Sequence, residues 1–202
     1  YERTFGAETT TMRWQRLDGK PERIKTEIHS EIDQTEMDSD FATKTWKVED
    51  QQQQTDLQIQ RKHDRLHLAG HFKGEQIDSW EEIDEAPWFQ TMSISFRPFL
   101  ADREKSITFW IVRPDTLGIH KLRAVKRGVE ELTIQGETMK AEKLELRLVG
   151  LGAPFWKANY WFRQSDHLFL RDVGPGGRPG SPRIVVEIKD LKTSVSLASK
   201  EP

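Results

Sequence analysis

Three histidines have the spacing that most resembles a metal site in this sequence. His63, His67 and His71 recur every four residues, which on a helix would place three imidazoles on one ridge able to bind a metal ion. Leu66 and Leu68, however, alternate with polar residues at a period of two, which is typical of a strand. On a strand, neighbouring histidines of this series lie about 13 Å apart, too far to share one ion. The sequence therefore predicts surface histidines and no metal site.

A group of carboxylates stands just before Pro87, namely Glu81, Glu82, Asp84 and Glu85. Two such groups can in principle serve as a general acid and a general base. A helix N-terminus explains them more simply, because negative charge is favourable there and Asp84 is a good N-cap. Pro87 suits the first helical turn, where its missing N–H is harmless. We therefore predict a helix over residues 84–97.

Motifs for nucleophilic, metal or phosphate chemistry are not found. The chain has no cysteine, which excludes a disulfide, a thiolate nucleophile and a Cys-ligated zinc. Neither G-x-S-x-G nor H-E-x-x-H occurs, and neither phosphate-binding glycine motif occurs. The glycines of residues 174–180 are interrupted by prolines, which remove the backbone donors that a phosphate cradle needs. We expect no catalytic residue and no cofactor.

Aromatic side chains give the best indication of a ligand site. The candidate ligand-binding residues are Trp88, Phe89, Phe96, Trp110, Trp156 and Trp161. They support two interpretations. Large aromatics can fill an ordinary core between a curved sheet and a helix. Alternatively, they can line an apolar cavity for a lipid or another hydrophobic ligand.

The elements that position these residues are mostly strands, because alternation at a period of two dominates the chain. The clearest run places Ile24, Thr26, Ile28, Ser30 and Ile32 on one face. Further alternating runs follow around residues 66–72, 107–111, 144–148 and 184–188, with turns expected at residues 127–128 and 135–136. Ten or more short strands predict a mainly β fold, a strongly curved antiparallel sheet forming a half-barrel or open barrel.

One helix is expected on the concave face of this sheet, but residues 91–97 leave an alternative open. Trp88, Met92 and Phe96 recur at helical spacing, and Pro98 closes that pattern. Met92, Ile94 and Phe96 also alternate at a period of two, as in a strand. We favour the helix because its start signal is explicit.

Composition limits the function classes. Of 202 residues, 35% are hydrophobic and 32% charged, yet seven tryptophans are too many for a disordered chain. A transmembrane helix needs about 20 apolar residues, and no such run occurs. The net charge of −2 leaves no excess to neutralise phosphates, so nucleic acid is not expected as a partner. No linker divides the chain, which predicts a single β-rich domain over residues 1–191 and a frayed tail over residues 192–202.

Several motifs resemble an uncharacterised family of bacterial envelope proteins. They are PWF at residues 87–89, SFRPF at 95–99, ITFWIVRPD at 107–115, PFWKANYWFR at 154–163 and the loop at 174–182. The resemblance covers residues 80–188 and departs at residues 165–167, where the usual glycine of a turn is absent. The family is similar in outline to lipoprotein-carrier half-barrels of the periplasm. With a chain that begins at Tyr1 rather than Met, this implies a periplasmic or secreted protein whose signal peptide has been removed.

Three functional hypotheses follow. The first is a non-catalytic binding module for a hydrophobic or lipid-like ligand. The second is an envelope structural or assembly protein that has a solid aromatic core and acts through surface contacts with an envelope protein. The third is an enzyme of unidentified reaction. An apolar pocket of several hundred Å³ would favour the first and a closed core the second.

Overall fold

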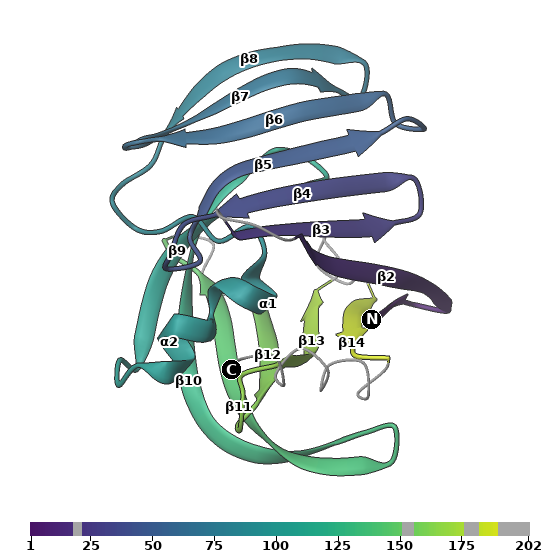
Figure 1. The fold of residues 1–202 in the computed structure, drawn as a ribbon, viewed down its shortest axis with the longest axis vertical. Helices are drawn as coiled ribbons and strands as arrows, with labels where there is room; N and C mark the ends of the chain where they lie inside the picture. Colours follow the sequence, from purple (N-terminus) through teal and green to yellow (C-terminus); the bar gives the residue numbers. More distant parts are fainter. Residues whose placement is uncertain (18–21, 151–155, 176–181, 190–202) are drawn as a thin grey trace. The chain divides into compact units, whose positions relative to one another are not determined.

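The computed structural model describes residues 1–17, 22–150, 156–175 and 182–189 (Figure 1). Within these ranges the chain forms strands and one short helical segment. The elements are β1 (Glu2–Phe5), β2 (Glu8–Leu17), β3 (Glu22–Ile28), β4 (Glu31–Met37), β5 (Thr43–Asp50), β6 (Thr55–Lys62), β7 (Arg65–Phe72), β8 (Glu75–Glu82), α1 (Met92–Ser95), α2 (Arg97–Ala101), β9 (Ser106–Val112), β10 (Ile119–Ile134), β11 (Glu137–Leu148), β12 (Lys157–Arg163), β13 (Phe169–Pro175) and β14 (Arg183–Glu187).

The described strands follow one hydrogen-bonding order, β8-β7-β6-β5-β4-β3-β2-β1-β14-β13-β12-β11-β10-β9. Neighbours whose register is described pair antiparallel. The ladder has two ends, β8 and β9, so the described strands do not close into a ring. The prediction of a mainly β fold with an open antiparallel sheet is confirmed.

The chain divides into two compact units. Unit 1 is Tyr1–Thr11 with Ala124–Pro202, and unit 2 is Met12–Arg123. Strands β2 and β10 each contribute residues to both units, so no linker separates them. The single domain over residues 1–191 stays a prediction, and the tail at 192–202 lies outside the described residues.

Unit 2 contains a meander in which β3 to β8 follow one another as antiparallel hairpins (Figure 1). Its core takes alternate residues from neighbouring strands, as the period of two requires. The buried members on β5, β6 and β7 are Trp46, Val48, Leu57, Ile59, Leu66 and Leu68. Leu66 and Leu68, which the period of two places on one face of a strand, are therefore both on the buried face.

The run from Ile24 to Ile32 is not one strand. β3 ends at Ile28 and β4 begins at Glu31, and a turn joins them in which His29 has a φ of 53°. Ile28 lies opposite Glu31. The turn could not be recognised from the sequence for two reasons. Its residues, His29 and Ser30, continue the alternation without a break, and the position with positive φ is not a glycine.

The helix begins later than predicted. Residues 84–91 are not helical, because their backbone groups bond elsewhere. The Phe89 N–H donates to the Trp110 carbonyl at 2.9 Å, and the Trp110 N–H donates to the Pro87 carbonyl at 2.8 Å. The helical segment instead runs through α1 and α2, so the choice of helix over strand for residues 92–97 is correct. Pro98 lies in the first turn of α2 and does not end the helix.

An aromatic cluster joins the helical segment to β9 inside unit 2. The ring centroids of Phe96 and Phe109 are 5.2 Å apart and edge-to-face, and those of Phe89 and Phe109 are 5.3 Å apart. Phe96 and Phe109 are fully buried, as is Trp88 on the neighbouring segment. The N-terminus of α1 contacts β4, since the hydroxyls of Thr91 and Thr35 lie 2.9 Å apart. This part of the aromatic set is a closed core.

Unit 1 is built from β1, the first residues of β2, the longer part of β10 and β11 to β14. The turn expected at residues 127–128 is absent, because both residues lie inside β10. Gly128 has a φ of 99°, which lets the strand continue through a conformation that other residues rarely adopt. The turn at residues 135–136 is confirmed. Residues 174–175 end β13 rather than belonging to a loop, while residues 176–181 lie outside the described part of the chain.

A partly buried carboxyl lies on the inner face of the unit 2 sheet. Asp33 on β4 is paired with Thr26 and Val48 on the adjacent strands. Burial raises the pKa of Asp33 to about 7, against hydrogen bonds from Thr26 and Trp46 that lower it. The native state therefore keeps its proton at a pH where the unfolded chain has lost it.

We expect the stability of unit 2 to fall as pH rises from about 4 to about 7. In that interval Asp33 is ionised in the unfolded chain but keeps its proton in the native protein. The free energy of unfolding should therefore fall by about 2 kcal/mol, a figure that allows for relaxation of the structure around Asp33. Urea unfolding at pH 5 and pH 8 measures it. Asp33→Asn should remove most of this dependence of stability on pH. If the variant shows the same dependence as the parent, Asp33 is not its cause.

Candidate functional site

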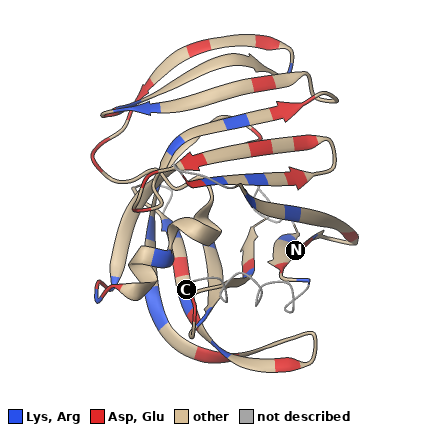
Figure 2. Ribbon diagram, viewed as in Figure 1, with Lys and Arg blue, Asp and Glu red and all other residues tan. Residues whose placement is uncertain are grey.

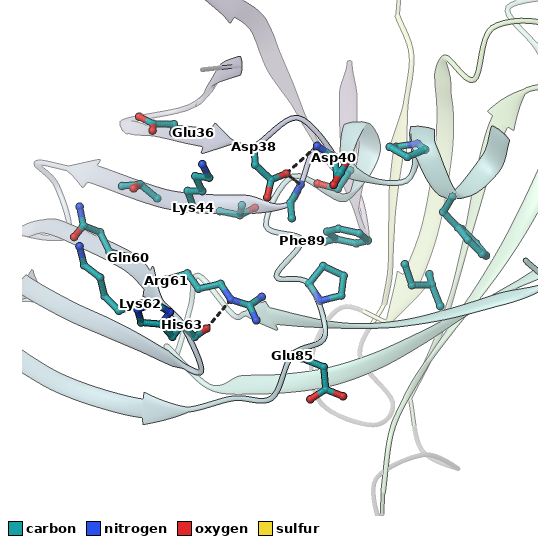
Figure 3. Close-up of a pocket in the computed structure, with 18 of the residues that line it drawn as sticks. Glu36, Asp38, Asp40, Lys44, Gln60, Arg61, Lys62, His63, Glu85 and Phe89 are labelled. Atoms are coloured by element: carbon teal, nitrogen blue, oxygen red, sulfur yellow. Dashed lines mark hydrogen bonds between the residues drawn. The ribbon is translucent and has the colours of Figure 1, made fainter. Parts of the chain in front are cut away.

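A pocket of ≈ 830 Å³ opens in unit 2 (Figure 3). Its walls come from the connection between β4 and β5, the end of β6, the segment before α1, the helices themselves and the start of β9. The lining residues are Glu36, Asp38, Asp40, Ala42, Thr43, Lys44, Thr45, Gln60, Arg61, Lys62, His63, Glu85, Pro87, Phe89, Ser95, Pro98, Phe99, Asp102, Glu104, Ser106 and Ile107.

One part of the lining is apolar. It consists of Pro87, Phe89, Pro98, Phe99 and Ile107. Phe89 and Phe99 are members of the aromatic cluster, and both contact Phe96. The pocket therefore borders the closed core of unit 2, and the outer edge of that core forms its apolar wall.

The rest of the lining is charged and mostly acidic. The carboxylates are Glu36, Asp38, Asp40, Glu85, Asp102 and Glu104, against the cations of Lys44, Arg61 and Lys62. Asp38 holds its own loop, because its Oδ1 accepts the backbone N–H groups of Asp40 at 2.9 Å and Ala42 at 3.0 Å. Figure 3 shows these bonds beside Lys44 and Phe89.

Arg61 positions the segment that carries the apolar wall. Its guanidinium donates to three backbone carbonyls, those of His63 at 3.0 Å, Asp84 at 3.0 Å and Ala86 at 2.8 Å. Burial lowers the pKa of Arg61, against the nearby carboxylates of Asp84 and Asp38. With its donors directed at carbonyls, Arg61 fixes the shape of the pocket wall, and it keeps its positive charge.

A hydroxyl group without a partner lies in the pocket wall. Ser95 of α1 is 1% exposed, and its Oγ has no hydrogen-bond partner within the described residues. Thr43 is equally buried, but its Oγ1 accepts the Gln90 N–H at 2.9 Å. A buried hydroxyl left unpaired costs free energy, but the Ser95 Oγ has almost no accessible surface, so a ligand atom could bond to it only if the wall moved.

Asp84, expected to be a helix N-cap, instead connects β9 and β10 to the segment before α1. It accepts a hydrogen bond from the Trp110 indole at 2.7 Å and forms an ion pair with Lys121. Lys121 also lies over the Trp110 ring. The Lys121 ammonium, followed by the Trp110 indole, lowers the pKa of Asp84 to about 2.

We expect Asp84 to contribute to acid sensitivity. Its native pKa is below the ordinary value of 3.8, so its stabilisation is present above about pH 4 and is lost as pH falls toward 2. Asp84→Asn should therefore flatten the decline of stability between pH 4 and pH 2. The urea midpoint of both proteins across that range measures the effect, and parallel profiles would count against it.

The predicted aromatic site residues are divided between the two units. In unit 2, Phe89 lines the pocket, while Trp88 and Phe96 are fully buried beside it. Trp110 is partly buried and bonds to Asp84. Trp156 and Trp161 belong to unit 1, where the Trp161 indole donates to Glu130 at 2.7 Å. Of the predicted set, the pocket therefore takes Phe89 alone.

The three histidines do not come together. His63 lies in a turn at the pocket, whereas His67 and His71 are on β7. His67 stacks on Trp80 with ring centroids 4.3 Å apart, and its Nε2 lies 2.8 Å from Asp78. In the part of the chain that the structure describes, no three His, Asp or Glu side chains are grouped as metal ligands.

A solved structure has a similar fold. It is the β-barrel-like protein of a domain of unknown function (DUF1849) from Brucella abortus, with a TM-score of 0.53 and 9% identity over 90% of this chain and 79% of that one. The hypothetical lipoprotein YmcC from Escherichia coli has a TM-score of 0.36 and 12% identity over 90% of this chain and 84% of the other. The first likeness supports the fold alone, and the second carries no argument.

Sequence comparisons add no family. No family model matches the chain, and no curated protein matches it. The described residues contain no helix that is long and apolar enough to cross a membrane. The likeness to the Brucella abortus protein therefore bears on the fold, and no comparison assigns an activity.

Proposed function

We propose that this protein is a non-catalytic binding module for a hydrophobic or lipid-like ligand, held in the pocket of unit 2. The observation that carries this proposal is the ≈ 830 Å³ volume bordered by Phe89, Phe99 and Ile107. Ligand pockets occupy about 300–1,000 Å³ and combine an apolar wall with a few polar groups. The fully buried Trp88 and Phe96 make the wall behind this volume solid, which favours a preformed site.

The charge of the lining narrows the ligand class. Carboxylates outnumber cations around the opening, and Arg61 is directed at backbone carbonyls. An anionic head group would therefore face like charge, whereas a cationic or uncharged head group would not. The ligand we propose is an amphiphile with an apolar body and a cationic or uncharged polar end.

Two matched amphiphiles test this proposal. Dodecylamine and dodecanoate share one alkyl chain and differ in head-group charge, and calorimetry below their micellar concentrations measures binding of each. We expect dodecylamine to bind at least about fivefold more tightly. Ile107→Glu should weaken it at least about tenfold, because it places a carboxylate in the apolar wall.

The control is Val129→Glu, which adds the same charge at an exposed position of unit 1, and it should bind as the parent does. If neither amphiphile binds, or if Ile107→Glu and the parent bind equally, the pocket is not the ligand site. If dodecanoate binds more tightly, the proposed preference for a cationic or uncharged head group is wrong, although the pocket remains the ligand site.

An envelope location is part of the same proposal. It is supported by the resemblance of residues 80–188 to bacterial envelope proteins. Fractionation of cells that express the full-length gene should place the protein in the periplasmic or membrane-associated fraction. Recovery in the cytosolic fraction would contradict it.

A second candidate function is assembly through surface contacts. The edge strand β8 favours it, since β8 pairs with β7 alone among the described strands and carries Trp80, which is 52% exposed. Edge strands offer unpaired backbone groups to an extended partner. A photo-cross-linker at exposed position 82 of β8 should then capture one specific envelope protein, and loss of that product when Trp80→Ala is added would support the contact.

A further inference from the structure

Three cationic side chains of unit 1 converge on one buried carboxylate. Glu145 of β11 is 6% exposed. Its Oε1 lies 2.6 Å from Nη2 of Arg127 and 2.9 Å from Nε of Arg147, and its Oε2 lies 2.5 Å from Nζ of Lys157. The cations come from β10, β11 and β12, three successive strands of the sheet. Figure 2 shows the basic segments of β10 and β11 in blue.

The register of the strands brings these groups to one face. Arg147 lies opposite Lys157, and Glu145 lies opposite Asn159, so the four side chains share a side of the sheet. Two of the three cations bond to the same carboxylate oxygen, so their charged groups are close neighbours. The Asn159 amide adds a neutral hydrogen-bonding group on the same face.

Charge in this cluster is not balanced. Lys157, followed by Arg127 and Arg147, holds the pKa of Glu145 at about 2, so the carboxylate is ionised at neutral pH. One negative charge therefore faces three positive ones. Within the described residues, no second carboxylate forms an ion pair with any of the three cations.

Most donors of the cluster remain available. Arg147 bonds to Glu145 through Nε, which leaves the two terminal nitrogens of its guanidinium, and Arg127 uses one terminal nitrogen. The side chains of Arg127, Arg147 and Lys157 are each about half exposed. Arginine donors are arranged to bind two oxygens of one anion, and a phosphate group supplies several oxygens and up to two charges.

We propose that Arg127, Arg147 and Lys157 form a binding site for a phosphate group, with Glu145 as the positioning residue that holds the three cations together. The site belongs to unit 1 and is separate in residues from the pocket of unit 2. The excess of two positive charges matches a phosphate monoester or inorganic phosphate, and it also suits the phosphodiester of a lipid head group.

Two probes test the site and distinguish the two sources of phosphate. Calorimetry with inorganic phosphate measures binding in solution, and co-sedimentation measures binding to vesicles of phosphatidylglycerol with phosphatidylcholine against phosphatidylcholine alone. Low ionic strength is used because exposed charges are screened within about 10 Å at 0.1 M salt. We expect at least tenfold weaker binding in the double variant Arg147→Gln, Lys157→Gln, and at least threefold in Arg127→Gln.

The matched control is Lys143→Gln on the same strand as Arg147. Lys143 pairs with Glu130 and not with Glu145, so this variant removes one positive charge and leaves the cluster intact. Binding should change less than twofold. Phosphate should also raise the melting temperature of the parent and of Lys143→Gln, but not that of the double variant.

Binding of inorganic phosphate that is lost in the double variant supports a soluble phosphate ligand. Binding to anionic vesicles alone, lost in the same variant, supports a lipid head group. No binding of either probe overturns the proposal, and so does equal weakening by the control and the double variant, because that result indicates general electrostatic attraction.

Discussion

Replacing Trp88 by alanine is expected to destabilise the fold by about 4 kcal/mol, the usual cost of truncating a fully buried tryptophan. Trp88 has no exposed surface and packs in the cluster that includes Ile83, Leu66 and Val112. Its indole N–H also donates to the Gln90 side chain at 3.0 Å. The substitution removes that bond together with the apolar contacts. Urea unfolding at pH 7, followed by circular dichroism, measures the loss.

Trp80→Ala is the control for this experiment. Trp80 is mostly exposed, so its loss should cost about 1 kcal/mol or less, mainly from the stack on His67. If Trp88→Ala also cost only about 1 kcal/mol, Trp88 would border empty space and not a packed core. Trp88→Phe gives an intermediate measurement, because it keeps a ring in the same position. The pair of results therefore separates a closed core from an aromatic cavity.

Gly70→Ala is the second substitution for which a large effect is expected, a loss of about 3 kcal/mol or more. Gly70 on β7 lies opposite Leu57 on β6 and has a φ of 132°, which side chains rarely tolerate. A Cβ at this position would lie 2.2 Å from the Asp56 carbonyl oxygen. Because that oxygen belongs to the backbone of the adjacent strand, the two strands would have to move apart.

Gly128→Ala separates backbone strain from this clash. Gly128 has a φ of 99°, but no atom lies within 4 Å of the position that a Cβ would occupy. Its replacement should cost about 1 kcal/mol from conformation alone. Urea unfolding of both variants measures the difference, and equal losses would show that contact with β6 contributes nothing at Gly70.

Much of the fold could be predicted from the sequence because sheet residues alternate between two environments. The alternation at Leu66 and Leu68 is reproduced in the structure, as is the turn at residues 135–136. The predicted start of the helix was wrong because backbone hydrogen bonds to a distant strand outweigh the local sequence preference for a helix. Asp84 and Pro87 match a helix start, but Pro87 and Phe89 bond to Trp110, twenty or more residues later in the chain. The helix propensity of a short segment contains no information about a hydrogen bond to a residue so far away in the sequence.

The candidate site was less accessible to sequence reasoning. Phe89 was among the aromatic residues predicted to bind a ligand. Phe99 belongs to the SFRPF motif, one of those that resemble the envelope family. The charged side chains around the pocket carried no such signal, since Glu36, Arg61 and Glu104 look like ordinary solvated residues of three separate segments. The same holds for Glu145, which stands in an alternating run and is buried beside cations that come from three different strands.

The pairing of β1 with β14 has a consequence for the order in which the chain can fold. Glu2 lies opposite Glu187, so this ladder joins the two ends of the described chain. Unit 2 is one continuous stretch, and its hairpins join neighbours in sequence, contacts that form early because little chain entropy is lost. Unit 1 must wait until the ribosome has made β14. During synthesis, the emerging protein therefore has a folded middle and a strand β1 that can pair with β2 but still lacks β14.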